Sequence, residues 1–183
     1  MLKNKKLIAI TVSVILTLAV ATGTTLALLS SFAGPLENVF TIGKVEITLT
    51  ETTGNDYSMI PGNEITKDPH VTVKGGSESC WLYVSVEKSE GFDDYLSFDM
   101  ADGWHPLAGH SGIYYRSVER AGGDVEFPIL KNDVIVVSST LTEEKMSEIS
   151  SAPTLTVKAY AIQSHSIETA SDGWLRIAEE VGQ

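Results

Sequence analysis

Histidines are the side chains to test first for catalysis, because a zinc peptidase usually holds its metal through two of them. The chain has four: His70, His105, His110 and His165. It lacks the His-Glu-x-x-His spacing that sets two ligands and a base on one helix face. His105 and His110 lie five residues apart in WHPLAGH, where a loop could bring both to one ion with Asp102 or Glu119. Histidines in such loops are more often solvated. The sequence therefore leaves His105 and His110 as weak metal candidates and predicts no cofactor.

The sequence also contains no motif that is typical of nucleophilic catalysis. The chain has no Gly-x-Ser-x-Gly elbow. Its one cysteine, Cys80, lies in the strand-like stretch SCWLYVSVE without an adjacent histidine, so we expect a buried, unreactive thiol. The acidic pairs Asp93-Asp94 and Glu143-Glu144 are neighbours in sequence, which points them apart on a strand and toward solvent on a helix. The sequence predicts no catalytic residue and no enzyme.

Aromatic residues offer a different chemistry, stacking on sugar rings. Trp104, Tyr114 and Tyr115 would form a carbohydrate- or surface-binding module if they were exposed on a loop, whereas the alternative is that they fill the core. Trp81 and Tyr83 alternate with the apolar face of their strand. That pattern indicates either a central strand covered on both faces or an outward aromatic row at a subunit contact.

The N-terminus has the three-part layout of a secretory signal. MLKNKK carries three lysines, an apolar run extends from Leu7 to Val20, and no acid occurs before Glu37. Small residues at the end of this run place a cut between Ala27 and Leu28. The competing interpretation is an uncleaved anchor over residues 7–29, since a membrane span needs roughly 20 apolar residues.

Charge limits the classes of partner. The full chain has a formal charge of −11. Without residues 1–27, which hold three of the 13 basic residues and no acid, 156 residues remain with a charge of −14. Such a surface argues against binding nucleic acid, whose phosphates need lysine and arginine. The remaining length suits one domain with its own core.

Short strand-like runs separated by turns fill the chain after residue 37. Alternating apolar residues predict strands over 38–50, 65–73, 80–87, 95–100, 112–119, 124–129, 133–137 and 154–163. Thr140 and Glu143 form a capping box for a short helix, and the spacing from Ile167 to Ala178 predicts an amphipathic C-terminal helix. Gly75-Gly76 and Gly122-Gly123 are predicted as hairpin turns. The fold class is mainly β, a β-sandwich of jelly-roll type with one or two short helices, preceded by a signal peptide helix.

Several short motifs, in order along the chain, resemble the TasA/camelysin family of exported bacterial proteins. The leader carries Gly23-Thr24 and Ala27, and the first strand carries Phe40, Gly43, Val45 and Ile47. Pro61-Gly62, VTVKGGSESCWLYVSVE and TLTVKAYAIQ with a tryptophan-bearing helix complete the set. The chain departs from the family at the cleavage alanine, where Leu28-Leu29 stands in place of an aromatic pair. The resemblance implies a signal peptidase of SipW type, a jelly-roll domain, and a place on the cell surface or in the biofilm matrix.

The resemblance also implies assembly into fibres, in which the freed N-terminal segment adds as a strand to the next subunit. Residues 28–37 would be this linker or donor segment, followed by the sandwich domain at 38–183. The apolar donor candidates are Leu28, Leu29, Phe32, Leu36 and Val39. Gly34-Pro35 interrupts them, because proline cannot donate a ladder hydrogen bond. The alternative is a disordered stub.

The expected function is therefore that of a secreted structural protein, a fibre-forming or accessory subunit that binds itself or related matrix subunits. The resemblance also brings a rival, because the camelysin name is attached to a metallopeptidase activity. The carbohydrate- or surface-binding module is the third hypothesis.

Overall fold

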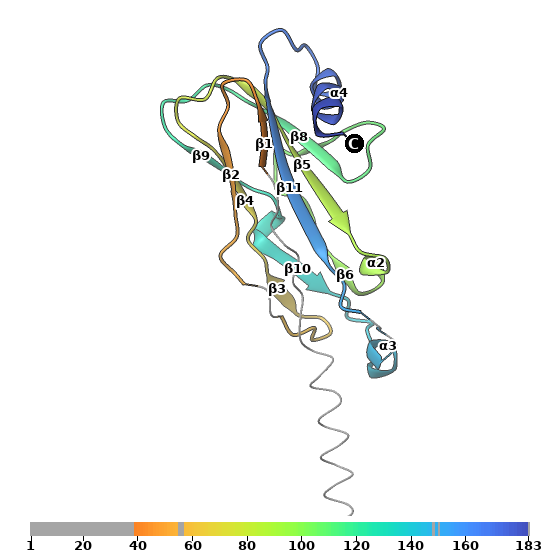
Figure 1. Ribbon diagram of the computed structural model, residues 1–183. Helices are drawn as coiled ribbons and strands as arrows, with labels where there is room; N and C mark the ends of the chain where they lie inside the picture. Colours follow the sequence, from red (N-terminus) through yellow and green to blue (C-terminus); the bar gives the residue numbers. More distant parts are fainter. Residues whose placement is uncertain (1–38, 55–56, 148, 150, 183) are drawn as a thin grey trace, which may run out of the picture.

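Two layers of β-strands face each other and enclose the larger buried cluster of the protein (Figure 1). The computed structural model describes residues 39–54, 57–147, 149 and 151–182. The predicted signal peptide (1–27), linker (28–37) and cleavage site at Ala27 and Leu28 lie outside these residues. The prediction of a mainly β chain is confirmed. No helix in the described ranges is both long and apolar enough to cross a membrane.

The first layer is a five-stranded sheet with the order β1-β11-β5-β8-β7. Its strands are β1 (Val39–Ile42), β11 (Leu155–Gln163), β5 (Cys80–Lys88), β8 (Ile113–Val118) and β7 (His105–Pro106). β5 and β11 form its centre and pair antiparallel over nine residues, from Cys80 opposite Gln163 to Lys88 opposite Leu155. Cys80, Leu82 and Val84 point into the core and are fully buried, as the alternation predicts.

The second layer consists of two three-stranded sheets, β2-β4-β9 and β3-β10-β6. Their strands are β2 (Ile47–Thr50), β3 (Glu64–Thr66), β4 (His70–Val73), β6 (Leu96–Ser97), β9 (Val125–Pro128) and β10 (Val134–Val137). Two hydrogen bonds lie where the chain passes between these sheets, and each one extends the pairing of a single sheet. The Lys67 N–H donates to the Asp133 carbonyl (2.7 Å), and the Ile129 N–H donates to the Pro69 carbonyl (3.0 Å). The β3–β4 and β9–β10 segments thus stay together across an irregular stretch. The single strand predicted over 65–73 is wrong, because the chain is interrupted around Pro69 and its two parts belong to different sheets.

Helix α4 (Ala170–Val181) covers the outer face of the first layer. The Thr169 side chain caps it by accepting a hydrogen bond from the Asp172 N–H (3.1 Å). Trp174 packs edge-on against Tyr160 with ring centroids 5.3 Å apart. The buried Tyr83 hydroxyl donates to the Ala170 carbonyl (2.7 Å). The predicted C-terminal helix is confirmed, and so is the interpretation of residues 80–87 as a central strand covered on both faces.

The segment 38–50 was predicted as one strand, and this is wrong. Gly43 has a φ of 88°, in the left-handed region, and turns the chain from β1 in the first layer to β2 in the second. A Cβ atom at this position would lie 2.8 Å from Oε1 of Gln163, so the turn also needs the close approach that glycine allows. Apolar residues continue to alternate through the break, which made two strands look like one.

The two glycine pairs were predicted as hairpin turns, which is also wrong. β4 and β5 belong to different sheets, as do β8 and β9, so both glycine pairs lie in connections between the layers. These connections touch each other. A Cβ atom on Gly75 would lie 2.9 Å from the Cα atom of Gly123, and the Gly76 N–H donates to the Ala121 carbonyl (3.1 Å).

The described chain has two further short helices, α2 (Phe92–Tyr95) and α3 (Glu143–Ser147). α3 confirms the short helix but not its predicted cap. The hydroxyl that accepts at its start belongs to Thr142, from the Lys145 N–H (3.3 Å). The Thr140 hydroxyl instead pairs with that of Ser138 (2.9 Å). α2 and β7 were not predicted from the sequence, because elements of four and two residues are too short to show a period.

Candidate functional site

The histidines have separate surroundings. The exposed His105 ring lies against Tyr115, with centroids 5.7 Å apart, whereas the His110 ring lies 6.2 Å from that of Trp174. His70 lies within ion-pair distance of two carboxylates: its Nε2 is 3.1 Å from Asp133, and its Nδ1 is 3.5 Å from Glu126. In the part of the chain that the structure describes, no group of three or more histidine, cysteine, aspartate or glutamate side chains could hold a metal ion. His105 and His110 therefore have different aromatic neighbours, and within the described ranges they share no carboxylate.

Cys80 is the group whose chemistry the structure defines best. Its side chain is fully buried on the inner face of β5. Burial raises the pKa of the thiol to about 12, because desolvation penalises the thiolate. The predicted packing role of Cys80 is confirmed.

The three aromatic candidates for sugar binding do not form one surface. Trp104 is 7% exposed and packs in the inner cluster, and its Nε1 donates to the Pro128 carbonyl (2.8 Å). Tyr114 packs against the same inner cluster. Tyr115 packs on the opposite face of β8, between Trp81 and Tyr83. This placement fits the interpretation of Trp104 and Tyr114 as core residues.

The free border of the first layer is a stronger candidate. β1 is its outermost strand and the only member that runs parallel to its neighbour, with Val39 opposite Ala159 and Ile42 opposite Ile162. The ring of Phe40 stacks on that of Tyr160 with centroids 5.3 Å apart, which fixes β1 against β11. Within the described residues no strand pairs with the other side of β1. The main-chain groups on that side can accept a further strand.

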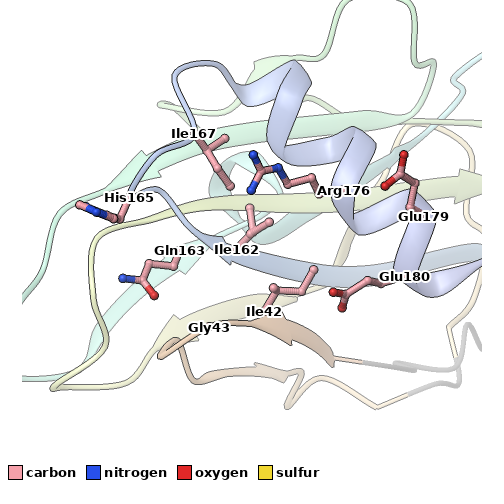
Figure 2. Close-up of a pocket in the computed structure, with 9 residues that line it drawn as sticks. All are labelled: Ile42, Gly43, Ile162, Gln163, His165, Ile167, Arg176, Glu179 and Glu180. Carbon is pink, nitrogen blue, oxygen red and sulfur yellow. The ribbon is translucent and has the colours of Figure 1, made fainter.

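A hollow of about 480 Å³ opens beside the end of this strand, between β1, β11 and α4 (Figure 2). Its apolar residues are Ile42, Ile162 and Ile167. Its charged side chains come from α4, where Figure 2 shows Arg176 on the side of Ile167, with Glu179 and Glu180 one turn further along the helix. Gln163 and His165 line the end next to Gly43.

The charges of this hollow are not neutralised within the described residues. Among the residues that the structure describes, Arg176 has no carboxylate within ion-pair distance, although Glu179 and Glu180 lie on the same helix. Both signs of charge therefore border an apolar floor at the end of β1, a strand with one unpaired side. A polypeptide segment, with its apolar side chains and main-chain dipoles, matches this arrangement better than a small molecule of one charge.

The predicted donor residues fall on both sides of the described boundary. Leu28, Leu29, Phe32 and Leu36 lie outside the described residues. Val39 is the first residue of β1 and is paired within its own sheet. Sequence reasoning missed the hollow, because the parallel pairing that brings Ile42 to Ile162 joins strands more than a hundred residues apart. The amphipathic spacing of α4 was the one signal that a charged helix face would be exposed near this border.

Comparison of the chain with family models, with curated proteins and with solved structures finds no match.

Proposed function

We propose that this protein is an exported, non-enzymatic subunit of the bacterial cell surface or biofilm matrix, built on a jelly-roll β-sandwich. It assembles when the N-terminal segment of one copy adds as a strand to the free side of β1 in the next. The observation that carries the proposal is the unpaired border of β1 beside the hollow under α4. An added strand there would complete hydrogen bonds along β1 and place alternate side chains beside Ile42 at the edge of the hollow.

The length of the N-terminal segment suits this geometry. Residues 28–37 directly precede β1, so the segment leaves its own domain at the strand that the next copy would use. Ten extended residues reach at most about 35 Å, whereas a four-residue strand is about 13 Å long. Because Pro35 cannot donate a hydrogen bond, the paired part of the donor is residues 28–33, with Leu28, Leu29 and Phe32. The stretch from Gly34 is then the link to the domain.

The test compares filament formation by the chain that starts at Leu28 with three altered forms. One form starts at residue 38 and lacks the donor. The second carries Thr41→Lys, which places a charge on the exposed middle of β1. The third carries Thr66→Lys, a matched control on β3, an exposed strand at the border of another sheet.

Electron microscopy and sedimentation should show filaments for the unaltered chain and for Thr66→Lys only. Filaments that survive both the truncation and Thr41→Lys would refute strand addition at β1. Export is tested separately, by the N-terminal residue and mass of the protein recovered from the medium. Cleavage after Ala27 gives a chain of 156 residues starting at Leu28.

A further inference from the structure

Arg116 occupies a position where an apolar residue is expected. It lies on β8 opposite Leu82 of β5, and Leu82 is fully buried on the inner face of the sheet. The neighbouring inward residues of β8, Tyr114 and Val118, belong to the core cluster. The half-buried Arg116 side chain therefore enters the border of the space between the two layers, where charged residues are rare unless they are paired.

Two aromatic rings hold the guanidinium in place. Its central carbon lies 3.9 Å from the centroid of Phe127 on β9 and 5.2 Å from that of Trp104. The hydrogen bond from Trp104 to the Pro128 carbonyl fixes the second ring. The absence of a side chain at Gly103 leaves space for the guanidinium, because a Cβ atom there would lie 2.8 Å from Nη2 of Arg116. Both rings contact the cation through cation–π interactions, which use none of its hydrogen-bond donors.

No described residue satisfies these donors. Nε of Arg116 is inaccessible to solvent and has no hydrogen-bond partner, and the side chain has no ion pair. Burial also lowers the pKa of the guanidinium, since desolvation disfavours its charged form. Five basic side chains of the described chain have carboxylate partners, whereas Arg116 shares with Arg176 the lack of one: the paired residues are Lys67, Lys74, Lys88, Arg120 and Lys158. The two Nη groups are not enclosed, so in a chain this rich in carboxylates they remain available to a group that comes from outside the domain.

The site is open toward a border of the sandwich. β7 pairs with β8 only at Tyr114 and Tyr115, so within the described residues β8 has no further neighbour at Arg116. β9, which carries Phe127, is likewise the last strand of its sheet. Of the three guanidinium nitrogens, only Nε is enclosed without a partner. A ligand can therefore approach the cation from the side where both layers end.

We propose that Arg116 is a carboxylate-binding site at the β8–β9 border of the sandwich. A carboxylate fits because its two oxygens match the planar fork formed by the two Nη groups, which the enclosed Nε leaves as the reachable donors. The site has a single cation in a strongly acidic protein, which suits a singly charged group better than a phosphate dianion. The carboxylate belongs either to a small molecule or to an aspartate or glutamate of a second copy.

Titration of the purified protein, with the N-terminus that the cell leaves on it, tests this site with sodium acetate as the probe and sodium chloride at equal ionic strength as the control. The first readout is the Nε–H resonance of Arg116 in a ¹H–¹⁵N spectrum, and the second is tryptophan fluorescence. Acetate should shift the Arg116 resonance with saturation in the millimolar range. Arg116→Met, which keeps the apolar stem, should weaken the fluorescence response by at least about tenfold, the loss expected for charge-assisted hydrogen bonds.

A second pair of variants keeps the test valid if Arg116→Met does not fold. Gly103→Ala pushes a methyl group into the guanidinium, whereas Gly109→Ala alters another left-handed glycine whose Cβ atom would meet nothing within 4 Å. Gly103→Ala should reduce acetate binding and Gly109→Ala should not. A response without saturation, or one that is equal for acetate and chloride, would overturn the proposal.

Sedimentation of the same samples separates the two sources of the carboxylate. Self-association that acetate and Arg116→Met both weaken assigns the ligand to a second copy. Saturable acetate binding by a protein that stays monomeric assigns it to a small molecule. This site lies away from β1, so Thr41→Lys should leave acetate binding unchanged even if it abolishes filaments.

Discussion

Replacing Lys67 by methionine should destabilise the protein strongly, because it would leave a buried carboxylate without its cation. Lys67 and Glu51 form an ion pair in which the side chains are only 2% and 4% exposed. The Lys67 Nζ also lies 5.6 Å from the centre of the Tyr57 ring. Glu51 Oε1 accepts further hydrogen bonds from the hydroxyls of Thr53 (3.2 Å) and Tyr57 (3.4 Å). The carboxylate is thus held in place for the ammonium group.

The expected magnitude follows from the cost of an unpaired buried charge. Removing one partner of a buried ion pair typically costs about 3–5 kcal/mol, against a total stability of about 5–15 kcal/mol. For a chain of this size, about 2–4 °C of melting temperature corresponds to 1 kcal/mol, so Lys67→Met should lower the melting temperature by about 6–20 °C. Lys67→Met combined with Glu51→Leu should be more stable than Lys67→Met alone, since no charge is then left buried.

The assay is urea unfolding, followed by tryptophan fluorescence, for Lys67→Met, for Glu51→Leu and for the variant that carries both substitutions. Lys88→Met is the matched control, because its ion pair with Asp93 is 38% and 72% exposed and should contribute less than about 1 kcal/mol. If Lys67→Met costs no more than Lys88→Met, water reaches the Glu51 carboxylate and the burial argument fails.

Three further predictions concern single groups. Cys80, whose pKa burial raises to about 12, should resist thiol reagents at pH 8 until urea unfolds the chain, and labelling of the native protein at the unfolded rate would contradict its burial. Burial alone would raise the pKa of Asp68, but hydrogen bonds from Thr52 and Thr53 outweigh it and lower that pKa to about 2. Because this pKa lies below the unfolded value of about 4, the stabilisation is complete above pH 4 and is lost as the pH falls toward 2, and acid titration of Asp68→Asn should lack this component. A Cβ atom on Gly173 would overlap the Tyr83 hydroxyl, so Gly173→Ala should cost about 1–3 kcal/mol, and Tyr83→Phe should recover part of that loss in urea unfolding.

The strands of the core could be predicted from the sequence because their side chains alternate. Cys80 to Val86 and Leu155 to Ala161 show a period of two on one face, and the structure pairs these segments as β5 and β11. Helix α4 could also be predicted from the sequence, since its apolar residues repeat with helical spacing over three turns.

What the sequence did not reveal depends on contacts between distant residues. Gln163 leaves no room for a side chain at Gly43, where the strand breaks. The pairing of Ile42 with Ile162 creates the hollow beside β1. Arg116 gave no signal at all, because its environment consists of Phe127 from the other layer and Trp104 from a loop. Local patterns do not record such neighbours.

The parallel pairing of β1 with β11 has a consequence for how the protein is made. The first described strand of the chain finds its partner only in residues 159–162, near the other end. During synthesis, β1 and the nine-residue strand β5 must wait for β11 until almost the whole chain has left the ribosome. The first layer therefore forms late and through contacts over long sequence separations, which predicts slow folding. Until β11 has been synthesised, the unpaired strands of the nascent chain need protection from aggregation.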